Sequence, residues 1–219
     1  MKRVLVAGLA FLSLAGTAAA ADLPIAPAYP VKAPIYAPAY SWTGFYIGVN
    51  GGGGFGTSSW TTTGNFNTSG GVFGGTLGYN YQFGQGVIGI EGDGDWANIR
   101  GTTTTACPLG CRTSDTWMAT IRGRLGYAAD RFMPYVTGGA AFGDIRAATP
   151  GFAGVSNTNA GWTIGGGLEF AVAPRWTLKA EYLYVDLGNT ACGLACGAAA
   201  TNNVAFRTNL VRGGVNFHF

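Results

Sequence analysis

Charged side chains recur at alternate positions within segments that are otherwise apolar. Nine of them are candidates for chemistry because they lie in the middle of such segments: Glu91, Asp93, Asp95, Arg122, Arg124, Glu169, Lys179, Glu181 and Arg212. Charges that leave bulk water persist when they are paired and hydrogen-bonded. The five acidic and four basic groups therefore predict either a network of compensating ion pairs or the lining of an ion-selective path.

The four cysteines form two closely spaced pairs. Cys107 and Cys111 enclose Pro-Leu-Gly, and Cys192 and Cys196 enclose Gly-Leu-Ala. Disulfides are the default state of such thiols in an exported protein, and of the three connectivities we expect the two short local closures. A four-thiolate zinc site is the alternative, although its usual spacings are tighter and it suits reducing compartments.

His218 is the single histidine of the chain. A hydrolase would need a serine or another nucleophile near a base and an orienting carboxylate, and the sequence offers no such set near His218. The glycine-rich strings do not precede a helix, so no phosphate-binding loop is implied. We therefore expect no enzymatic activity, no cofactor and no metal site.

The N-terminus has the order of a secretory signal peptide. Lys2 and Arg3 precede an apolar run, 4–14, and small residues close the segment at 18–20. The apolar run is shorter than the ~20 residues that a spanning helix needs. We expect residues 1–20 to be removed, which lowers the formal charge from +3 to +1 because two basic and no acidic residues leave. Nothing in this balance indicates nucleic-acid binding.

Residues 21–41 form a segment rich in proline and alanine, with five prolines. Such a composition favours an extended, partly polyproline-like tether. It is interpreted as a periplasmic N-terminal segment, either a plain disordered leader or a spacer close to the peptidoglycan.

From residue 42 onward, apolar and polar residues alternate with a period of two, as expected for strands with two different faces. Phe45, Ile47 and Val49 share one face of the first run, for example. Eight such runs can be recognised, and the glycine- and alanine-rich fifth run, 132–143, has the least clear facing. Glycine, at 38 of 219 residues, is far above its usual share, which argues against a helical protein.

The connections between the runs alternate between short and long. Tight turns are expected at 84–86, 128–131 and 173–175. Long polar connections are expected at roughly 55–70, 98–115, 144–160 and 188–205. This alternation predicts an outer-membrane barrel with short periplasmic turns, long extracellular loops and both termini in the periplasm.

The charged face decides which side of the sheet is turned inward. The aromatic residues are too many and too large to fill an eight-stranded barrel, whereas lipid accommodates them outside. Residues 42–219 are therefore predicted to form an all-β, eight-stranded, antiparallel up-and-down transmembrane barrel with its charges in the lumen. Eight aromatic residues near strand ends are expected in the interfacial girdles: Trp42, Tyr81, Phe83, Trp96, Trp117, Trp162, Trp176 and Phe217.

Three segments carry a resemblance to a known family: 42–56, 74–84 and the closing Gly-Gly-Val-Asn-Phe-His-Phe. The chain resembles the small alphaproteobacterial outer-membrane proteins described as immunogenic or porin-family barrels, distant relatives of the OmpA transmembrane domain. The resemblance implies a role in envelope integrity, exposure to host immunity and, in some members, haemin binding. Phe217 and Phe219 resemble the C-terminal signal that the barrel-assembly machinery reads.

Three functions follow as hypotheses. An eight-stranded barrel is just wide enough for its own side chains, so a structural envelope barrel plugged by ion pairs is favoured. A narrow porin for small solutes is the second hypothesis. The third is a haemin-binding or adhesive surface protein, with Trp60, Phe66 and Phe152 as loop aromatics. Expected partners are outer-membrane lipid, lipopolysaccharide and the assembly machinery, and a host or haemin ligand at the loops.

Overall fold

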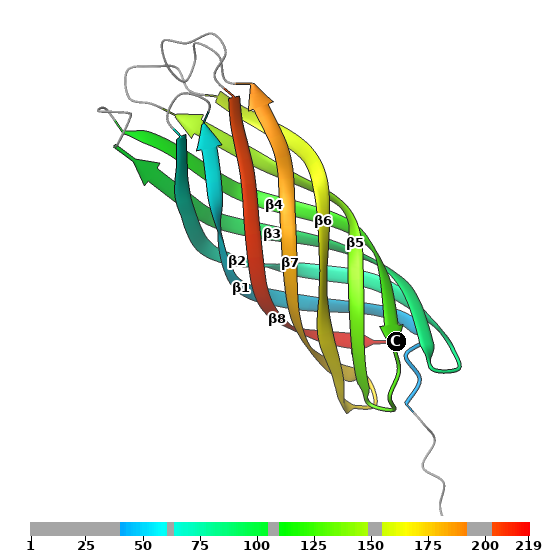
Figure 1. Cartoon of the computed structure of the whole chain (residues 1–219). Coiled ribbons are helices and arrows are strands. Elements are labelled where there is room, and N and C mark those ends of the chain that lie inside the picture. The colour runs from blue at the N-terminus through cyan, green and yellow to red at the C-terminus, as the bar shows by residue number, and fades with distance from the viewer. Residues whose placement is uncertain (1–39, 61–63, 105–109, 149–154, 192–202) are drawn as a thin grey trace, which may run out of the picture. The chain divides into compact units, whose positions relative to one another are not determined.

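A computed structural model describes residues 40–60, 64–104, 110–148, 155–191 and 203–219. Eight strands make up nearly all of this part of the chain: β1 (Gly44–Trp60), β2 (Gly64–Phe83), β3 (Gly86–Thr103), β4 (Cys111–Tyr127), β5 (Phe132–Ala148), β6 (Val155–Ala173), β7 (Trp176–Ala191) and β8 (Asn203–His218). Each strand pairs antiparallel with its neighbours along the chain, and β8 pairs with β1. The predicted eight-stranded up-and-down barrel is confirmed (Figure 1).

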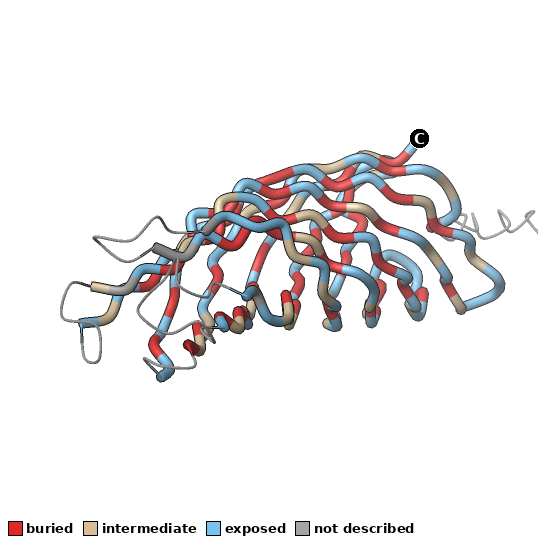
Figure 2. Tube along the Cα trace, turned by 90° about the horizontal axis from the view of Figure 1, so that it is seen from above, coloured by how far each residue is buried: buried red, intermediate tan, exposed pale blue. Residues whose placement is uncertain are grey.

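The alternation of apolar and polar residues places apolar side chains outside the barrel and polar side chains inside. Ile88 and Ile90 are exposed on β3, whereas Glu91 and Asp93 on the same strand are buried. Figure 2 shows the same alternation of buried and exposed residues along the other strands. On β5, where the pattern was least clear, Tyr135 faces inward.

The barrel has a turn end and a loop end. At the turn end, connections 84–85, 128–131 and 174–175 join consecutive strands. Gly84 and Asp130 have φ values of 60° and 54° there, a left-handed conformation that glycine and aspartate tolerate. At the loop end lie connections 61–63, 104–110, 149–154 and 192–202.

The strands extend much further toward the loop end than the sequence predicted. Residues 55–60 continue β1 and pair with both β2 and β8, although they were expected to belong to a long loop. The prediction failed because Gly, Ser and Thr were interpreted as loop formers, whereas paired neighbours on both sides satisfy their backbone groups. Strands of 16 to 20 residues exceed the ~9–11 residues that cross a bilayer.

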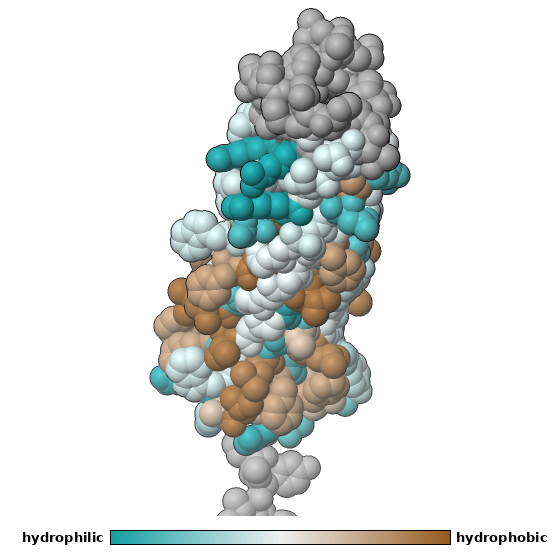
Figure 3. Space-filling model, turned by 90° about the vertical axis from the view of Figure 1, so that its left-hand side faces the viewer, coloured by the Kyte–Doolittle hydropathy of each residue, from teal (hydrophilic) through white to brown (hydrophobic). Residues whose placement is uncertain are grey.

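On the face that Figure 3 shows, apolar residues cover the half of the barrel toward the turn end, and hydrophilic residues lie beyond them toward the loop end. Exposed large apolar side chains occur on all eight strands, and we call this zone the apolar belt. Trp96, Trp117 and Trp162 mark the upper edge of the belt, and their side chains are exposed. Trp42 was expected in a girdle, but it is fully buried inside the turn end. No helix in the described residues is long and apolar enough to cross a membrane.

A shift in strand register changes the facing of β4. The pairing of β4 with β5 moves by one residue between Asp115 and Met118, so both side chains point into the barrel. A β-bulge of this kind bends its strand and redirects side chains. The alternation counted from the lower half of β4 therefore does not continue through its upper half.

Glycine permits a close approach of β1 to β8. A Cβ atom at Gly52 would lie 2.0 Å from the backbone oxygen of Val211. At the next residue, Gly53, the nearest heavy atom to such a Cβ would be 3.8 Å away, on Gly70. The absence of a side chain is thus required at the first position and not at the second.

We predict that Gly52→Ala lowers the free energy of unfolding of the refolded protein by about 1–3 kcal/mol, because the backbones of β1 and β8 must move apart. Urea titration in detergent micelles, followed by the mobility difference of heated and unheated samples, would measure this. Gly53→Ala is the matched control and should stay within about 0.5 kcal/mol of the wild type. Equal effects of the two substitutions would contradict the prediction.

Candidate functional site

The interior of the barrel is the candidate functional site, and its middle layer is charged. All nine charged residues singled out in the sequence are buried there: Glu91, Asp93, Asp95, Arg122, Arg124, Glu169, Lys179, Glu181 and Arg212. They come from β3, β4, β6, β7 and β8. The closure of the sheet brings together charges that are far apart in the chain, such as Arg212 and Asp95.

Arg122 on β4 lies at the centre of this layer. Its guanidinium contacts Glu91, and it pairs with Asp93 at 2.6 Å and with Glu181 at 3.0 Å. The side chains of all four residues have no exposed surface. One cation therefore joins two carboxylates of β3 to one of β7 across the lumen.

Arg212 makes a parallel set of contacts from β8. It pairs with Asp93 at 3.0 Å, with Asp95 at 2.7 Å and with Glu181 at 2.8 Å. Asp93 and Glu181 are thus shared between Arg122 and Arg212. Shared partners make the layer one connected network in place of separate pairs.

The part of the layer nearer the turn end is built around Glu91 and Arg124. Glu91 accepts a hydrogen bond from Lys179 Nζ at 3.0 Å and another from Tyr46 Oη at 2.8 Å. Arg124 donates to Tyr46 Oη at 3.0 Å, pairs with Glu169, and lies 3.8 Å from the ring centroid of Tyr135. The two tyrosines supply a hydroxyl and an aromatic face that Arg124 could not find in lipid.

Neutral side chains complete the hydrogen bonding of the carboxylates. Thr76 and Thr120 each donate to Asp93 at 2.8 Å. Thr177 donates to Glu169 at 2.5 Å, and Asn216 donates to the same oxygen at 2.9 Å. The sequence interpretation did not include these residues in the network. Their signal was present, however, because each occupies the inward phase of its strand.

An apolar layer fills the barrel between the charges and the loop end. Eleven buried side chains form it: Val72, Ala97, Ile99, Met118, Ala141, Ile145, Leu183, Val185, Leu187, Phe206 and Leu210. The sequence interpretation expected a polar lumen and missed this layer. Its signal lies on β7, where Leu183 and Val185 continue the same phase as Lys179 and Glu181. The layer was missed because the lumen was predicted from the charged residues alone, and the apolar residues of the same phase were not assigned to it.

A second apolar layer closes the turn end. Trp42 and Met133 are fully buried in it, and Trp42 Nε1 donates to the backbone oxygen of Asp130 at 3.0 Å. His218 lies between this layer and the charged layer, with its ring centroid 6.2 Å from that of Trp42 and 5.2 Å from that of Tyr46, and its Nε2 3.5 Å from Glu169. His218 therefore takes part in packing the floor of the barrel.

A polar cluster lies above the apolar layer, toward the loop end. Ser58 and Thr113 are 2.9 Å apart, and Trp60 Nε1 donates to Thr113 at 3.0 Å. The ring of Trp60 packs on Phe66, and both residues are buried. These two aromatics are therefore interior residues of strands and do not present rings for haemin at the surface. Phe152 lies outside the described residues.

Two further sequence predictions concern the cysteines and the C-terminus. Cys107, Cys192 and Cys196 lie outside the described residues, and Cys111 begins β4, so the disulfides stay a prediction. Phe217 packs against Trp176 and Phe219, with ring centroids 5.1 and 5.3 Å apart. Phe219 is 73% exposed, which leaves its ring on the outer surface at the turn end.

An antiparallel barrel with an apolar outer belt and charges inside is the architecture of an outer-membrane β-barrel protein. The chain belongs to the family described as the outer membrane protein beta-barrel domain, whose model matches residues 7–219. It is 36% identical over 245 residues to the 31 kDa outer-membrane immunogenic protein of Brucella melitensis, with complete coverage of both chains. The predicted family and the outer-membrane location are confirmed.

Two further relatives are similar to this chain over nearly the whole length of both sequences. The 25 kDa outer-membrane immunogenic protein of Brucella canis is 31% identical over 100% of this chain and 99% of its own. The 22 kDa outer membrane protein of Rhizobium leguminosarum is 33% identical over 99% of this chain and 100% of its own. Among solved structures, neisserial surface protein A has a TM-score of 0.47 at 17% identity, covering 81% of this chain and 98% of its own.

We predict that Arg122→Met destabilises the barrel by about 3–5 kcal/mol, because three carboxylates lose a buried partner at once. Equilibrium unfolding in urea, in the same detergent as the wild type, would measure the difference. Arg207→Met is the matched control, because Arg207 pairs with Asp186 on the outside and is 62% exposed in its side chain. The control should cost less than about 1 kcal/mol, and a similar loss in both variants would refute the prediction.

Asp115 lies inside the barrel beyond the tryptophan edge of the belt, and burial raises its pKa to about 7. Between pH 4 and pH 7 the unfolded chain ionises this carboxyl while the folded barrel keeps it protonated, so stability falls as the pH rises. We predict that Asp115→Asn removes this slope and stabilises the barrel above pH 7, on the order of 4 kcal/mol at full effect. Unfolding curves from pH 4 to 8 would test it. An unchanged slope relative to the wild type would contradict the assignment.

Proposed function

We propose that this outer-membrane surface protein acts as a closed structural barrel of the envelope and does not conduct solutes. The observation that carries the proposal is the filling of the lumen in three successive layers. Ion pairs occupy the middle, and apolar side chains occupy both sides of them. Eight strands leave little more room than these side chains need.

The layered interior distinguishes this proposal from a narrow porin. A conducting path would require a continuous polar lining, but Ile99, Leu183 and Phe206 are fully buried between the charges and the loop end. Trp42 and Met133 are fully buried at the other end. An ion would have to pass two apolar layers as well as the paired charges, and each such step carries a large desolvation cost.

We further propose that the loop end faces the outside of the cell and that both termini face the periplasm. Connections 104–110, 149–154 and 192–202 at the loop end are longer than any connection at the turn end, and bacterial barrels usually have their longer loops outside the cell. Trp42 enters the barrel through the turn end, and its backbone nitrogen donates to Gln82 Oε1 at 2.9 Å. The segment before it would then leave on the periplasmic side after removal of residues 1–20.

Surface exposure in this proposal comes from the upper strands as well as from the loops. Residues such as Thr57 and Arg207 continue the sheet beyond the apolar belt, so the barrel wall itself would project from the membrane. Relatives of this chain are described as immunogenic outer-membrane proteins. The corresponding proposal for this chain is that the host immune system recognises the part of the barrel wall beyond the apolar belt. The proposal includes no catalytic step.

Single-channel recording tests the closed lumen. We predict no steady openings for the refolded mature protein in planar bilayers, and none for Arg122→Ala, because both apolar layers remain in that variant. A porin recorded in the same bilayers serves as the positive control. Steady openings whose conductance changes in Arg122→Ala would overturn the proposal and make the protein a narrow porin with a charged filter.

A further inference from the structure

Three arginines gather on the outer surface of β3, β4 and β5 near the loop end. Arg100 and Arg146 lie directly opposite Ser114 on the two neighbouring strands. Arg112 lies two residues from Ser114 on β4 itself, on the same face. All three arginines are exposed and alternate with interior residues, so their side chains point away from the barrel. We call these three residues the arginine cluster.

The arginine cluster carries an excess of positive charge. Arg146 pairs with Asp144, with Nε and Oδ2 2.7 Å apart. Within the ranges that the structure describes, no acidic side chain forms an ion pair with Arg100 or Arg112. Three cations therefore face a single carboxylate. Guanidinium groups spaced around one point are suited to bind phosphate or carboxylate oxygens in a bidentate manner.

A groove runs along the outer wall directly below the arginine cluster. Trp96 and Trp117 pair across β3 and β4 and form its sides, while Gly94 and Ala119 pair below them and form its floor. The side chain of Trp96 stands out from the wall and is 74% exposed. A hypothetical Cβ at Gly94 would meet no heavy atom within 4 Å. The groove is thus open on its outer side, and its lining of two tryptophans, a glycine and an alanine suits an apolar group.

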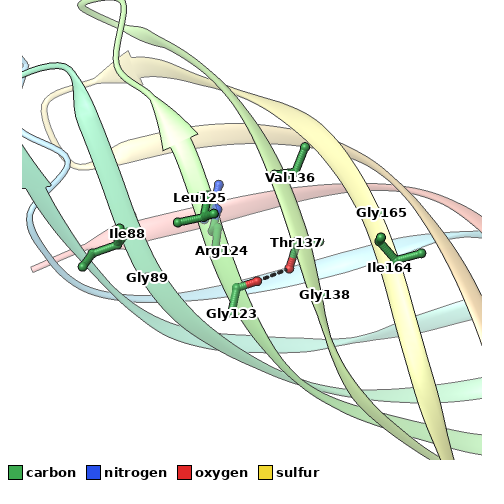
Figure 4. Close-up of a pocket in the computed structure, with 10 residues that line it drawn as sticks. All are labelled: Ile88, Gly89, Gly123, Arg124, Leu125, Val136, Thr137, Gly138, Ile164 and Gly165. Atoms are coloured by element: carbon green, nitrogen blue, oxygen red, sulfur yellow. Dashed lines mark hydrogen bonds between the residues drawn. The ribbon is translucent and has the colours of Figure 1, made fainter.

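The same side of the barrel carries a second groove nearer the membrane centre. Gly123 and Gly138 pair on β4 and β5, and they leave a hollow between larger apolar side chains. Figure 4 shows these side chains around the hollow: Ile88, Leu125, Val136 and Ile164. Both grooves are lined by residues of β4, and the exposed side chain of Ile121 lies between them.

The arginine cluster lies close to the outer limit of the lipid headgroup region. Trp96 marks the edge of the apolar belt, and Arg100 follows it by four residues on β3, about 13 Å along the strand. With the usual strand tilt of about 40°, this is about 10 Å above the hydrocarbon edge. The headgroup region of a bilayer extends about 5–8 Å beyond the hydrocarbon edge, and the long arginine side chains on the outer wall can reach back toward it.

We propose that this face of β3, β4 and β5 binds one anionic, multiply acylated lipid of the outer leaflet. The arginine cluster holds the phosphate groups of its headgroup, and the groove between Trp96 and Trp117 holds an acyl chain. The proposal rests on the orientation proposed above, with the loop end outside. Anion binding and an apolar groove on one wall favour a lipid over a soluble polyanion, which would leave the groove unused.

Native mass spectrometry of the refolded protein in detergent tests the proposal. We expect the wild type to retain one molecule of bisphosphorylated lipid A, and the double variant Arg100→Ala/Arg112→Ala to bind it about tenfold more weakly. Arg207→Ala is the matched control, because that exposed arginine already pairs with Asp186. A loss in the control as large as in the double variant would overturn the site.

The groove is tested independently by Gly94→Leu, which places a side chain in it at a position where an added Cβ meets no heavy atom within 4 Å. We expect this variant to fold normally and to lose most of the lipid A bound by the wild type. Gly71→Leu, on the outer face of β2, is the control and should bind as the wild type does. If Gly94→Leu binds normally, the acyl chain does not occupy this groove.

Comparison of ligands identifies the source of the anion. Phosphatidylcholine and phosphatidylglycerol should bind more weakly than lipid A, and the deacylated headgroup should not bind measurably. Equal binding of the deacylated headgroup would indicate a site for soluble polyanions, and equal binding of phosphatidylglycerol would indicate attraction to any anionic lipid. Either result would refute the proposal. Planar-bilayer recordings of the same preparation report on the closed lumen alone, so the two proposals fail independently.

Discussion

Every backbone N–H and C=O group in the bilayer core must find a partner within the protein, since neither water nor lipid provides one. This chain meets that constraint by pairing β8 with β1, which removes both sheet edges. Closure with eight strands also fixes the width of the interior at about the space that side chains fill. The identity of the inward residues then decides whether the lumen is open, and here those residues occupy it in layers.

Burying the charged layer carries a desolvation cost, which the shared ion pairs and hydrogen bonds offset. Removing several ions from water is repaid only when each has close partners and hydrogen bonds, and Asp93 has two arginines and two threonine hydroxyls. The arrangement also opposes register errors. Because side chains alternate strictly, a one-residue slip of β4 would turn Arg122 and Arg124 toward lipid. The network thus contributes to specifying how the strands pair.

The outer wall differs between its two ends because only part of each strand faces lipid. Lipid requires apolar side chains only along about ten residues of each strand, and β2 has 20 residues. Beyond the belt the wall is free to carry Arg100, Arg112 and their polar neighbours. The small residues within the belt leave grooves in a surface that lipid must cover. The outer wall therefore has both a general affinity for the membrane and local features that a particular lipid can recognise.

The sequence alone determined the number of strands, the facing of their halves toward the turn end and the residues of the charged layer. Each of these follows from the two-residue alternation of apolar and polar residues, which can be seen within a single strand. It did not determine where the strands end, since Ser58 or Thr113 can be satisfied by water in a loop or by a neighbouring strand. Nor did it reveal that Ile99, Leu183 and Phe206 meet inside, or that Arg100, Arg112 and Arg146 share one patch. Those contacts join residues from different strands, and only the register and closure of the barrel decided them.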